Sequence, residues 1–130
     1  MPTLPGNFTI LIVDDHQNMR RTISDLLRSV GFKSFAYAEN GRAALKVLKE
    51  QDIHLVVLDW MMPDMNGLEF LRHIRVDKIH QSLPVLMVTA EAASDKVLSA
   101  VQLGISDYIV KPFSPDTMFK KIAHILKTEF

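Results

Sequence analysis

Five short apolar runs recur along the chain, and several of them lack the alternation of apolar and polar residues that a half-exposed strand shows. They occupy residues 8–13, 34–38, 55–58, 84–88 and 108–110. Strands that are apolar on both sides are typical of a parallel sheet covered by helices on both faces. The runs therefore predict five strands of such a sheet.

Segments with helical spacing separate these runs. Met19, Ile23 and Leu27 begin one apolar stripe, and Gly31 follows as an expected stop. The other expected helices are marked by Ala44, Leu45 and Leu48 after Asn40, by Leu68, Leu71 and Ile74 after Asn66, by Val97, Ala100 and Val101 before Gly104, and by Met118, Ile122 and Ile125 after Ser114 and Pro115. Strand and helix alternate five times, which predicts a three-layer α/β fold with right-handed crossovers.

Composition limits both the number of domains and the function. A chain of 130 residues fits one domain, 1–130. Lys plus Arg and Asp plus Glu number 15 each, which argues against a general nucleic-acid binder and against a polybasic membrane contact. The sequence has no cysteine, so disulfides and thiolate chemistry are excluded. No apolar run approaches the roughly 20 residues of a membrane span, and no signal-type segment opens the chain; the expected location is cytoplasmic.

Polar side chains follow four of the five apolar runs. Asp14 and Asp15 come directly after the first run, Asp59 after the third, Thr89 after the fourth and Lys111 after the fifth. The carboxyl ends of parallel strands meet at one end of a sheet, where ligands of open α/β sheets bind. We therefore expect these groups to lie together, with Asp59 just outside the sheet at the end of its strand.

The chemistry of this set points to phosphoryl transfer. Three neighbouring carboxylates repel one another, and a divalent cation such as Mg²⁺, which prefers oxygen ligands, would relieve the repulsion. Lys111 adds a positive charge and Thr89 a hydroxyl donor, and both suit a phosphoryl group. An aspartate can attack phosphorus to form an aspartyl-phosphate. Asp14 and Asp15 form the natural metal pair, so Asp59 is the expected nucleophile.

Each residue also has an ordinary explanation. Asp14 could cap a helix, Thr89 could bond to nearby backbone, and Lys111 could be a solvated charge. These explanations do not account for four strand ends that deliver complementary groups. His16 directly follows the acidic pair, which invites a metal-ligand interpretation. The histidines, which are His16, His54, His73, His80 and His124, have no paired metal-binding spacing, so we expect structural or surface roles for them. Trp60 is expected over the rim of the site.

Five segments of the chain resemble the response-regulator receiver family, and more narrowly the single-domain chemotaxis regulators of the CheY type. The segments are I-L-I-V-D-D (10–15), M-R-R (19–21), D-W-M-M-P-D-M-N-G-L-E (59–69), L-P-V-L-M-V-T-A-E-A (83–92) and V-K-P-F (110–113). This resemblance implies a flavodoxin-like sheet with strand order 2-1-3-4-5. It also implies that Asp59 accepts a phosphoryl group. Mg²⁺ would then be bound by Asp14, Asp15, Asp59 and the backbone carbonyl of Met61.

The resemblance assigns further roles. Thr89 and Lys111 would contact the phosphoryl group, the peptide bond between Lys111 and Pro112 would be cis, and Tyr108 would be an aromatic switch. Met61 and Glu91 would tune hydrolysis of the phosphorylated state. Relatives of this type often carry Asn where this chain has Met61, so we expect the apolar side chain to change the phosphorylated lifetime.

The implied function is a two-component signalling switch rather than a turnover enzyme, although it would assist its own phosphorylation and dephosphorylation. A histidine kinase would be the donor, and a phosphatase could act on the product. The output surface would lie on the fourth helix, fifth strand and fifth helix, including Val97, Tyr108, Lys111 and Lys121, and would bind a flagellar motor switch protein. Alternatives are a phosphate sink, a stand-alone receiver in another pathway, and a phosphatase or phosphotransferase in which Asp64 is the acid.

Overall fold

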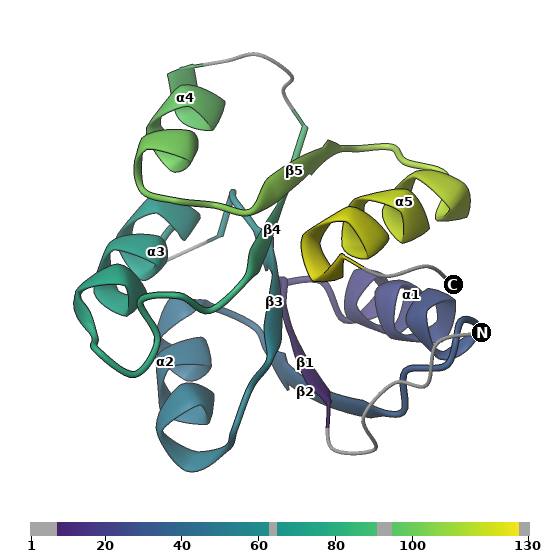
Figure 1. The fold of residues 1–130 in the computed structure, drawn as a ribbon, viewed down its shortest axis with the longest axis horizontal. Coiled ribbons are helices and arrows are strands. Elements are labelled where there is room, and N and C mark those ends of the chain that lie inside the picture. The colour runs from purple at the N-terminus through teal and green to yellow at the C-terminus, as the bar shows by residue number, and fades with distance from the viewer. Residues whose placement is uncertain (1–7, 63–64, 91–94, 128–130) are drawn as a thin grey trace.

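The computed structural model describes residues 8–62, 65–90 and 95–127, and they form a five-stranded parallel sheet between two layers of helices (Figure 1). The strands are β1 (Thr9–Val13), β2 (Ser34–Ala38), β3 (Leu55–Asp59), β4 (Val85–Thr89) and β5 (Asp107–Val110). They pair in the order β2-β1-β3-β4-β5, so the predicted fold class and strand order are confirmed.

Five helices connect the strands. They are α1 (Gln17–Arg28), α2 (Gly41–Glu50), α3 (Gly67–Val76), α4 (Asp95–Gln102) and α5 (Pro115–Leu126). Helices α1 and α5 cover one face of the sheet, and α2, α3 and α4 cover the other (Figure 1). Within the described residues, no helix combines the length and the apolar character needed to span a lipid bilayer.

The sheet contributes side chains to two separate cores. In β1, Leu11 and Val13 pack in the core beneath α2, α3 and α4, whereas Ile10 and Ile12 pack in the core beneath α1 and α5. Successive side chains of a strand point to opposite faces. A strand covered on both faces must therefore be apolar at every position, which explains the uninterrupted runs in the sequence.

Three helices begin at the polar residues that the sequence indicated. The side-chain oxygens of Asn40, Asn66 and Ser114 accept hydrogen bonds from backbone N–H groups in the first turns of α2, α3 and α5. Each cap satisfies a donor that has no partner within the helix. After α1 and α4, Gly31 and Gly104 adopt positive φ angles of 110° and 89°, as expected of residues that end helices.

Two expectations about α4 need correction. Val101 was expected on the buried stripe, but its side chain is 56% exposed, and the buried residues of α4 are Val97 and Ala100. Because α4 lies beside the outer strand β5 (Figure 1), it packs against the sheet over a narrow stripe only. The burial of Val97 also removes this residue from the surface on which we had expected it.

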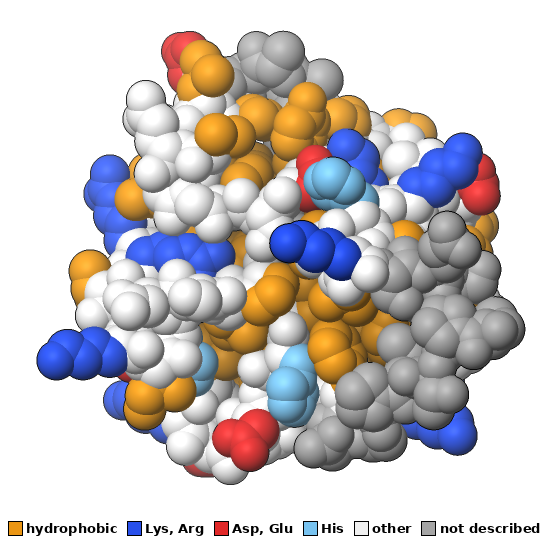
Figure 2. All heavy atoms as spheres, viewed as in Figure 1, with side chains coloured by type: hydrophobic (Ala, Val, Ile, Leu, Met, Phe, Trp, Pro, Cys, Tyr) orange, Lys and Arg blue, Asp and Glu red, His pale blue; other side chains and the backbone are white. Residues whose placement is uncertain are grey.

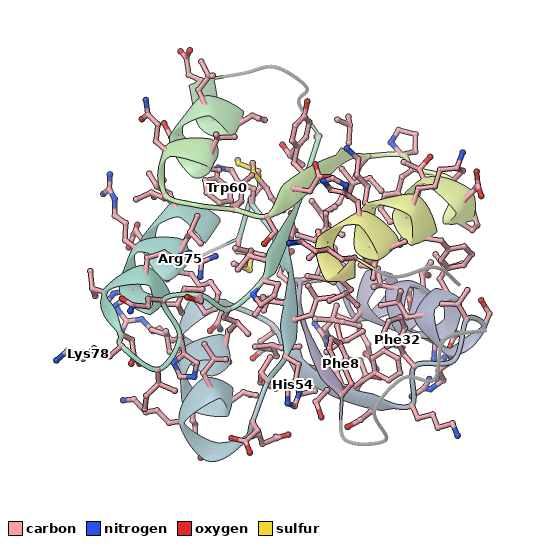
Figure 3. The ribbon with its side chains drawn as sticks, in the orientation of Figure 1. Phe8, Phe32, His54, Trp60, Arg75 and Lys78 are labelled. Atoms are coloured by element: carbon pink, nitrogen blue, oxygen red, sulfur yellow. The ribbon has the colours of Figure 1, made fainter. Side chains whose placement is uncertain are left out.

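Aromatic side chains pack at the amino end of the sheet. The ring of Phe8 lies 5.6 Å from that of Phe32 and 5.3 Å from that of His54, centroid to centroid (Figure 3). His54 also accepts a hydrogen bond from the Thr9 N–H through Nδ1, at 3.0 Å. The structural role expected of His54 is thus consistent with its contacts, and this end of the sheet is closed by packing.

We predict that Gly67→Ala destabilises the protein more than Gly41→Ala. Both glycines begin a helix, but a Cβ on Gly67 would lie 2.5 Å from the Trp60 ring and 3.0 Å from the Trp60 Cα. The atoms nearest Gly41 all belong to the flexible Met65 side chain. Overpacking against a rigid, buried neighbour costs about 1–3 kcal/mol, and urea unfolding of the two variants measures the difference. Equal decreases in the free energy of unfolding of the two variants would show that the close approach of Gly67 to Trp60 does not make position 67 less tolerant of a Cβ.

Candidate functional site

The polar residues at the strand ends meet at the carboxyl end of the sheet, as predicted. Asp14 follows β1, Thr89 ends β4, and Lys111 follows β5. The backbone ladder continues into these positions, because the Asp14 N–H donates to the Ala38 carbonyl and the Lys111 N–H donates to the Thr89 carbonyl at 2.7 Å. Their positions are thereby fixed by the sheet itself rather than by a loop.

Asp59 lies deeper than the sequence predicted. It is the last residue of β3, is paired with Val88 in β4, and is only 5% exposed. The expectation that it lies outside the sheet is therefore wrong. The end of the apolar run does not mark the end of the strand. Strand pairing depends on backbone hydrogen bonds to the neighbouring strand, so it can include a polar residue such as Asp59.

One ammonium group faces two buried carboxylates in this site. Lys111 Nζ lies 3.6 Å from Asp59 Oδ1 and 3.7 Å from Asp14 Oδ2. Both distances are too long for hydrogen bonds. Asp14 Oδ2 is buried and accepts no hydrogen bond from any residue that the structure describes. The carboxylates therefore retain acceptor positions that a ligand could use.

The same carboxylates could bind a divalent cation. One ligand atom each from Asp14, Asp15, His16 and Asp59 can be chosen so that all four lie within 4.8 Å of one another. Clustered carboxylate oxygens are the donors that Mg²⁺ prefers, and the buried oxygen Asp14 Oδ2, which accepts no hydrogen bond from a described residue, has room for a further ligand beside Lys111. The residues present thus fit the expected Mg²⁺. The Met61 carbonyl stays a predicted ligand, and the Met61 N–H donates to Asp59 Oδ1 at 3.3 Å.

Electrostatics in the site disfavour the charged form of Asp59. Burial contributes most to raising the pKa of Asp59 above its ordinary value of 3.8, followed by the Asp14 carboxylate, with Asp15 adding a smaller effect. The charge of Lys111 and the Met61 N–H lower the pKa but do not outweigh these effects. A positive ligand would remove the penalty on the ionised form.

Thr89 and Tyr108 lie on adjacent strands. Thr89 is buried at the end of β4, and Tyr108 in β5 is partly buried against the core beneath α2, α3 and α4. Lys121 Nζ lies 5.2 Å from the centre of the Tyr108 ring and 3.1 Å from Asp107 Oδ1. The geometry is compatible with the predicted switch, whose roles remain predictions.

The peptide bond between Lys111 and Pro112 is cis, as the resemblance implied.

The prediction that Trp60 lies over the rim of the site is wrong. Trp60 is buried in the core, and its carbonyl accepts a hydrogen bond from the Gly67 N–H at 3.1 Å. It appears among the labelled side chains of Figure 3. A tryptophan next to a polar residue gives no signal of which way its ring turns, so the sequence could not decide this. Glu91 and Asp64 lie outside the described residues.

His16 was expected at the surface, and its side chain is 71% exposed. The sequence did not predict that its Nδ1 lies 3.2 Å from Asp14 Oδ1 and 3.1 Å from Asp15 Oδ1. Spacing rules for metal sites look for pairs of histidines within one helix. The available signal was instead the position of His16 directly after an acidic pair at a strand end.

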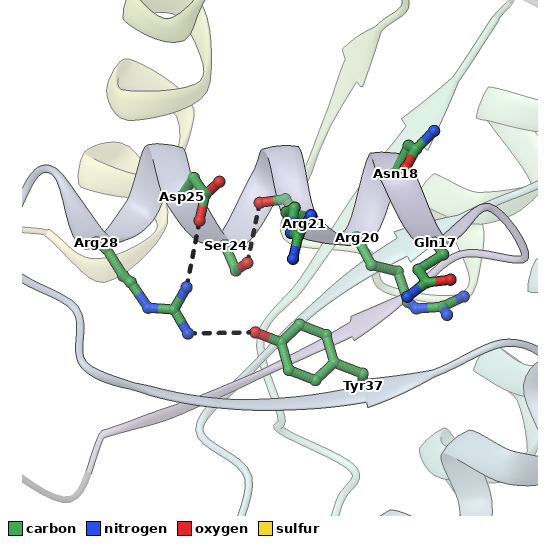
Figure 4. Close-up of a pocket in the computed structure, with 8 residues that line it drawn as sticks. All are labelled: Gln17, Asn18, Arg20, Arg21, Ser24, Asp25, Arg28 and Tyr37. Atoms are coloured by element: carbon green, nitrogen blue, oxygen red, sulfur yellow. Dashed lines mark hydrogen bonds and ion pairs between the residues drawn. The ribbon is translucent and has the colours of Figure 1, made fainter.

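A separate cavity of about 410 Å³ lies between α1 and β2 (Figure 4). Among its lining residues, Arg28 lies 3.3 Å from Asp25 Oδ1 and 3.5 Å from the Tyr37 hydroxyl. Arg20, another lining residue, donates from Nη1 to the Asp14 carbonyl at 2.6 Å. This cavity therefore supports the backbone of the acidic site from outside but gathers no reactive set of its own.

Comparison with known proteins agrees with this geometry. The family profile described as response regulator receiver domain matches residues 10–123. Chemotaxis protein CheY-3 of Vibrio cholerae is 46% identical over 124 residues, which cover 95% of each chain. Chemotaxis protein CheY of Pseudomonas aeruginosa is 46% identical over 118 residues, covering 91% of this chain and 95% of the relative. The solved structure of chemotaxis response regulator CheY4 of Vibrio cholerae superposes with a TM-score of 0.84 at 30% identity, covering 91% and 98% of the two chains.

We predict that Asp59→Asn stabilises the metal-free protein at neutral pH. Because the pKa of Asp59 is raised in the folded state, ionisation of Asp59 costs folding stability above the folded-state pKa, and this cost disappears as the pH falls below the unfolded value of 3.8. The difference in unfolding free energy between Asp59→Asn and the wild type should therefore decrease as the pH is lowered from 7 toward 4. Urea unfolding in EDTA across this range measures it.

Asp52→Asn is the matched control, because Asp52 is exposed and precedes β3 at the opposite end of the strand. Its effect should not follow the same pH dependence. A variant at Asp59 that is less stable than the wild type at pH 7 would contradict the repulsion inferred for the site.

Proposed function

The chain belongs to the response regulator receiver family, and we propose that it is a signalling switch in which Asp59 accepts a phosphoryl group from a histidine kinase. The observation that carries this proposal is the placement of two buried carboxylates, Asp59 and Asp14, at nearly equal distances from the ammonium group of Lys111. The chain would act in the cytoplasm, together with its donor kinase.

The proposed transfer is a displacement at phosphorus. A carboxylate oxygen of Asp59 attacks the phosphorus of phosphohistidine, a P–O bond forms as the P–N bond breaks, and the departing imidazole takes up a proton. Lys111, at 3.6 Å from Asp59, is placed to balance the charge of the incoming group. Asp14, Asp15 and Asp59 would hold Mg²⁺, which when bound supplies positive charge to the phosphoryl oxygens.

We regard the protein as an acceptor rather than a turnover enzyme. This proposal is supported by the match of residues 10–123 to the receiver family. Asp64, the acid of the phosphatase alternative, lies outside the described residues. We therefore propose that the receiver accelerates only its own phosphorylation and dephosphorylation. Its output then depends on binding another protein.

The output surface that we propose lies on α4, β5 and α5. Leu98 and Val101 on α4 are 61% and 56% exposed, and apolar side chains over α4 are visible in Figure 2. Tyr108 and Lys121 continue this surface onto β5 and α5, where their contact links the two elements. Charge added at Asp59 would draw Thr89 and Lys111 inward and shift an existing equilibrium between two arrangements of this surface. The names of the two relatives, both chemotaxis proteins, support a role in chemotaxis, and the partner that we propose is a flagellar motor switch component.

We predict that Asp59→Asn abolishes transfer of radiolabelled phosphate from a phosphorylated histidine kinase, because the amide cannot act as the nucleophile. Wild-type protein should take up at most one equivalent, in a Mg²⁺-dependent manner. The measurement is label retained on the protein after rapid separation from the kinase.

Asp52→Asn should be labelled like the wild type, because Asp52 is exposed and lies before the amino end of β3, away from the carboxyl ends of the strands. Undiminished labelling of Asp59→Asn would refute the assignment, and release of phosphate from a small ester far above one equivalent would favour a phosphatase. A phosphate sink predicts normal labelling of the wild type without phosphorylation-dependent capture by motor components. A pull-down of the phosphorylated protein distinguishes the sink from the switch.

We also predict that Met61→Asn shortens the lifetime of the phosphorylated protein. The Met61 side chain is 60% exposed beside the acceptor, and its sulfur lies 3.5 Å from Lys96 Nζ. An apolar group in this place should hinder the approach of the hydrolytic water, and asparagine should admit it. Decay of labelled protein after removal of the donor gives the rate, and equal rates for wild type and variant would show that Met61 has no such effect.

A further inference from the structure

His16 lies directly beside the acidic pair, and the proposed function gives it no role. It precedes α1 with an extended backbone (φ −101°, ψ 116°), and its side chain makes no capping bond to the helix. Its N–H donates to Asp14 Oδ1 at 2.8 Å, which fixes the backbone beside the carboxylate. The ring is thus held close to the site while most of its surface remains open to solvent.

The ring nitrogen and the carboxylates converge on a common point. Nδ1 of His16 lies 3.2 Å from Asp14 Oδ1 and 3.1 Å from Asp15 Oδ1. Asp59 adds a fourth ligand atom within the same 4.8 Å limit. Independently, the buried oxygen Asp14 Oδ2 accepts no hydrogen bond from a described residue. Both observations are expected where a cation completes a set of mixed nitrogen and oxygen ligands.

We propose that His16 Nδ1 is a nitrogen ligand of the cation site, so that the site prefers borderline transition ions such as Co²⁺, Ni²⁺ or Zn²⁺ more strongly than its carboxylates alone would. Imidazole suits these ions, whereas Mg²⁺ prefers oxygen ligands and retains its waters. The inference rests on the proposed function only in assuming that Asp14, Asp15 and Asp59 hold a cation. It adds that this chain selects among cations through a residue outside that carboxylate set.

A charged imidazole would make the opposite contribution. If His16 served only as a positive partner of Asp14 and Asp15, it would compete with every cation for the same oxygens. Removing it would then strengthen the binding of Mg²⁺ and Co²⁺ alike. If His16 is a ligand, removing it weakens Co²⁺ binding and leaves Mg²⁺ binding nearly unchanged. The sign and the selectivity of the effect therefore separate the two roles.

The experiment is calorimetric titration of the untagged full chain with CoCl₂ and with MgCl₂ at pH 8. His16→Gln should lose about tenfold or more in Co²⁺ affinity, as expected when a ligand to a metal is removed or misplaced, and change within about twofold for Mg²⁺. The visible absorption band of bound Co²⁺ should shift as the nitrogen ligand is lost. His124→Gln is the matched control, because His124 is exposed on α5, and it should bind both ions like the wild type.

A second measurement requires no substitution at all. In the wild-type protein, bound Co²⁺ should give the ring protons of His16 large paramagnetic shifts in the NMR spectrum. Equal Co²⁺ affinities of wild type and His16→Gln, or stronger binding of both ions by His16→Gln, would overturn the inference and leave the proposed function intact. Failure of the wild type to bind either ion would instead count against the cation site, and with it against the proposed function.

Discussion

Mutual repulsion of carboxylates at the end of a covered sheet is the constraint on which this structure depends. Asp14 and Asp59 are buried, and a single ammonium group, that of Lys111, lies near both without a hydrogen bond to either. Burial of unpaired charge is costly and persists only where the surroundings hold it in place. Here the parallel sheet provides that hold, because the backbone at the carboxyl ends of the strands bonds to the neighbouring strands, as the Asp14 N–H does to Ala38 in β2. The electrostatic cost of burying these carboxylates is largest when no cation is bound, so the same residues affect both the stability of the fold and the chemistry of the site.

Much of this arrangement could be predicted from the sequence. Uninterrupted apolar runs indicated a sheet covered on both faces, and the polar residues after four of the five runs indicated one shared end. The caps at Asn40, Asn66 and Ser114 could be predicted because each is a hydrogen bond between one side chain and the backbone of the helical turn that follows it. The strand order came from the resemblance to the receiver family, since periodicity does not say which strands are neighbours.

What could not be predicted depends on contacts between elements. The sequence placed Asp59 outside the sheet, but pairing with β4 draws it in. Trp60 turns into the core because Gly67 leaves room for its ring, a fit between residues on two elements that no local pattern records. Val101 is exposed because α4 lies beside the outer strand. The approach of His16 to two carboxylates likewise depends on a contact, the hydrogen bond from its backbone N–H to Asp14 Oδ1.

The division of β1 between two cores has a consequence for how such a chain can vary in length. Alternate residues of this strand serve opposite layers, and the strand ends at the acidic pair. Deleting or inserting one residue within it would turn the following side chains to the wrong layer and carry Asp14 away from its partners in the same event. Changes in length should therefore be confined to the connections between strands and helices, where an added residue does not change which layer the strand side chains face.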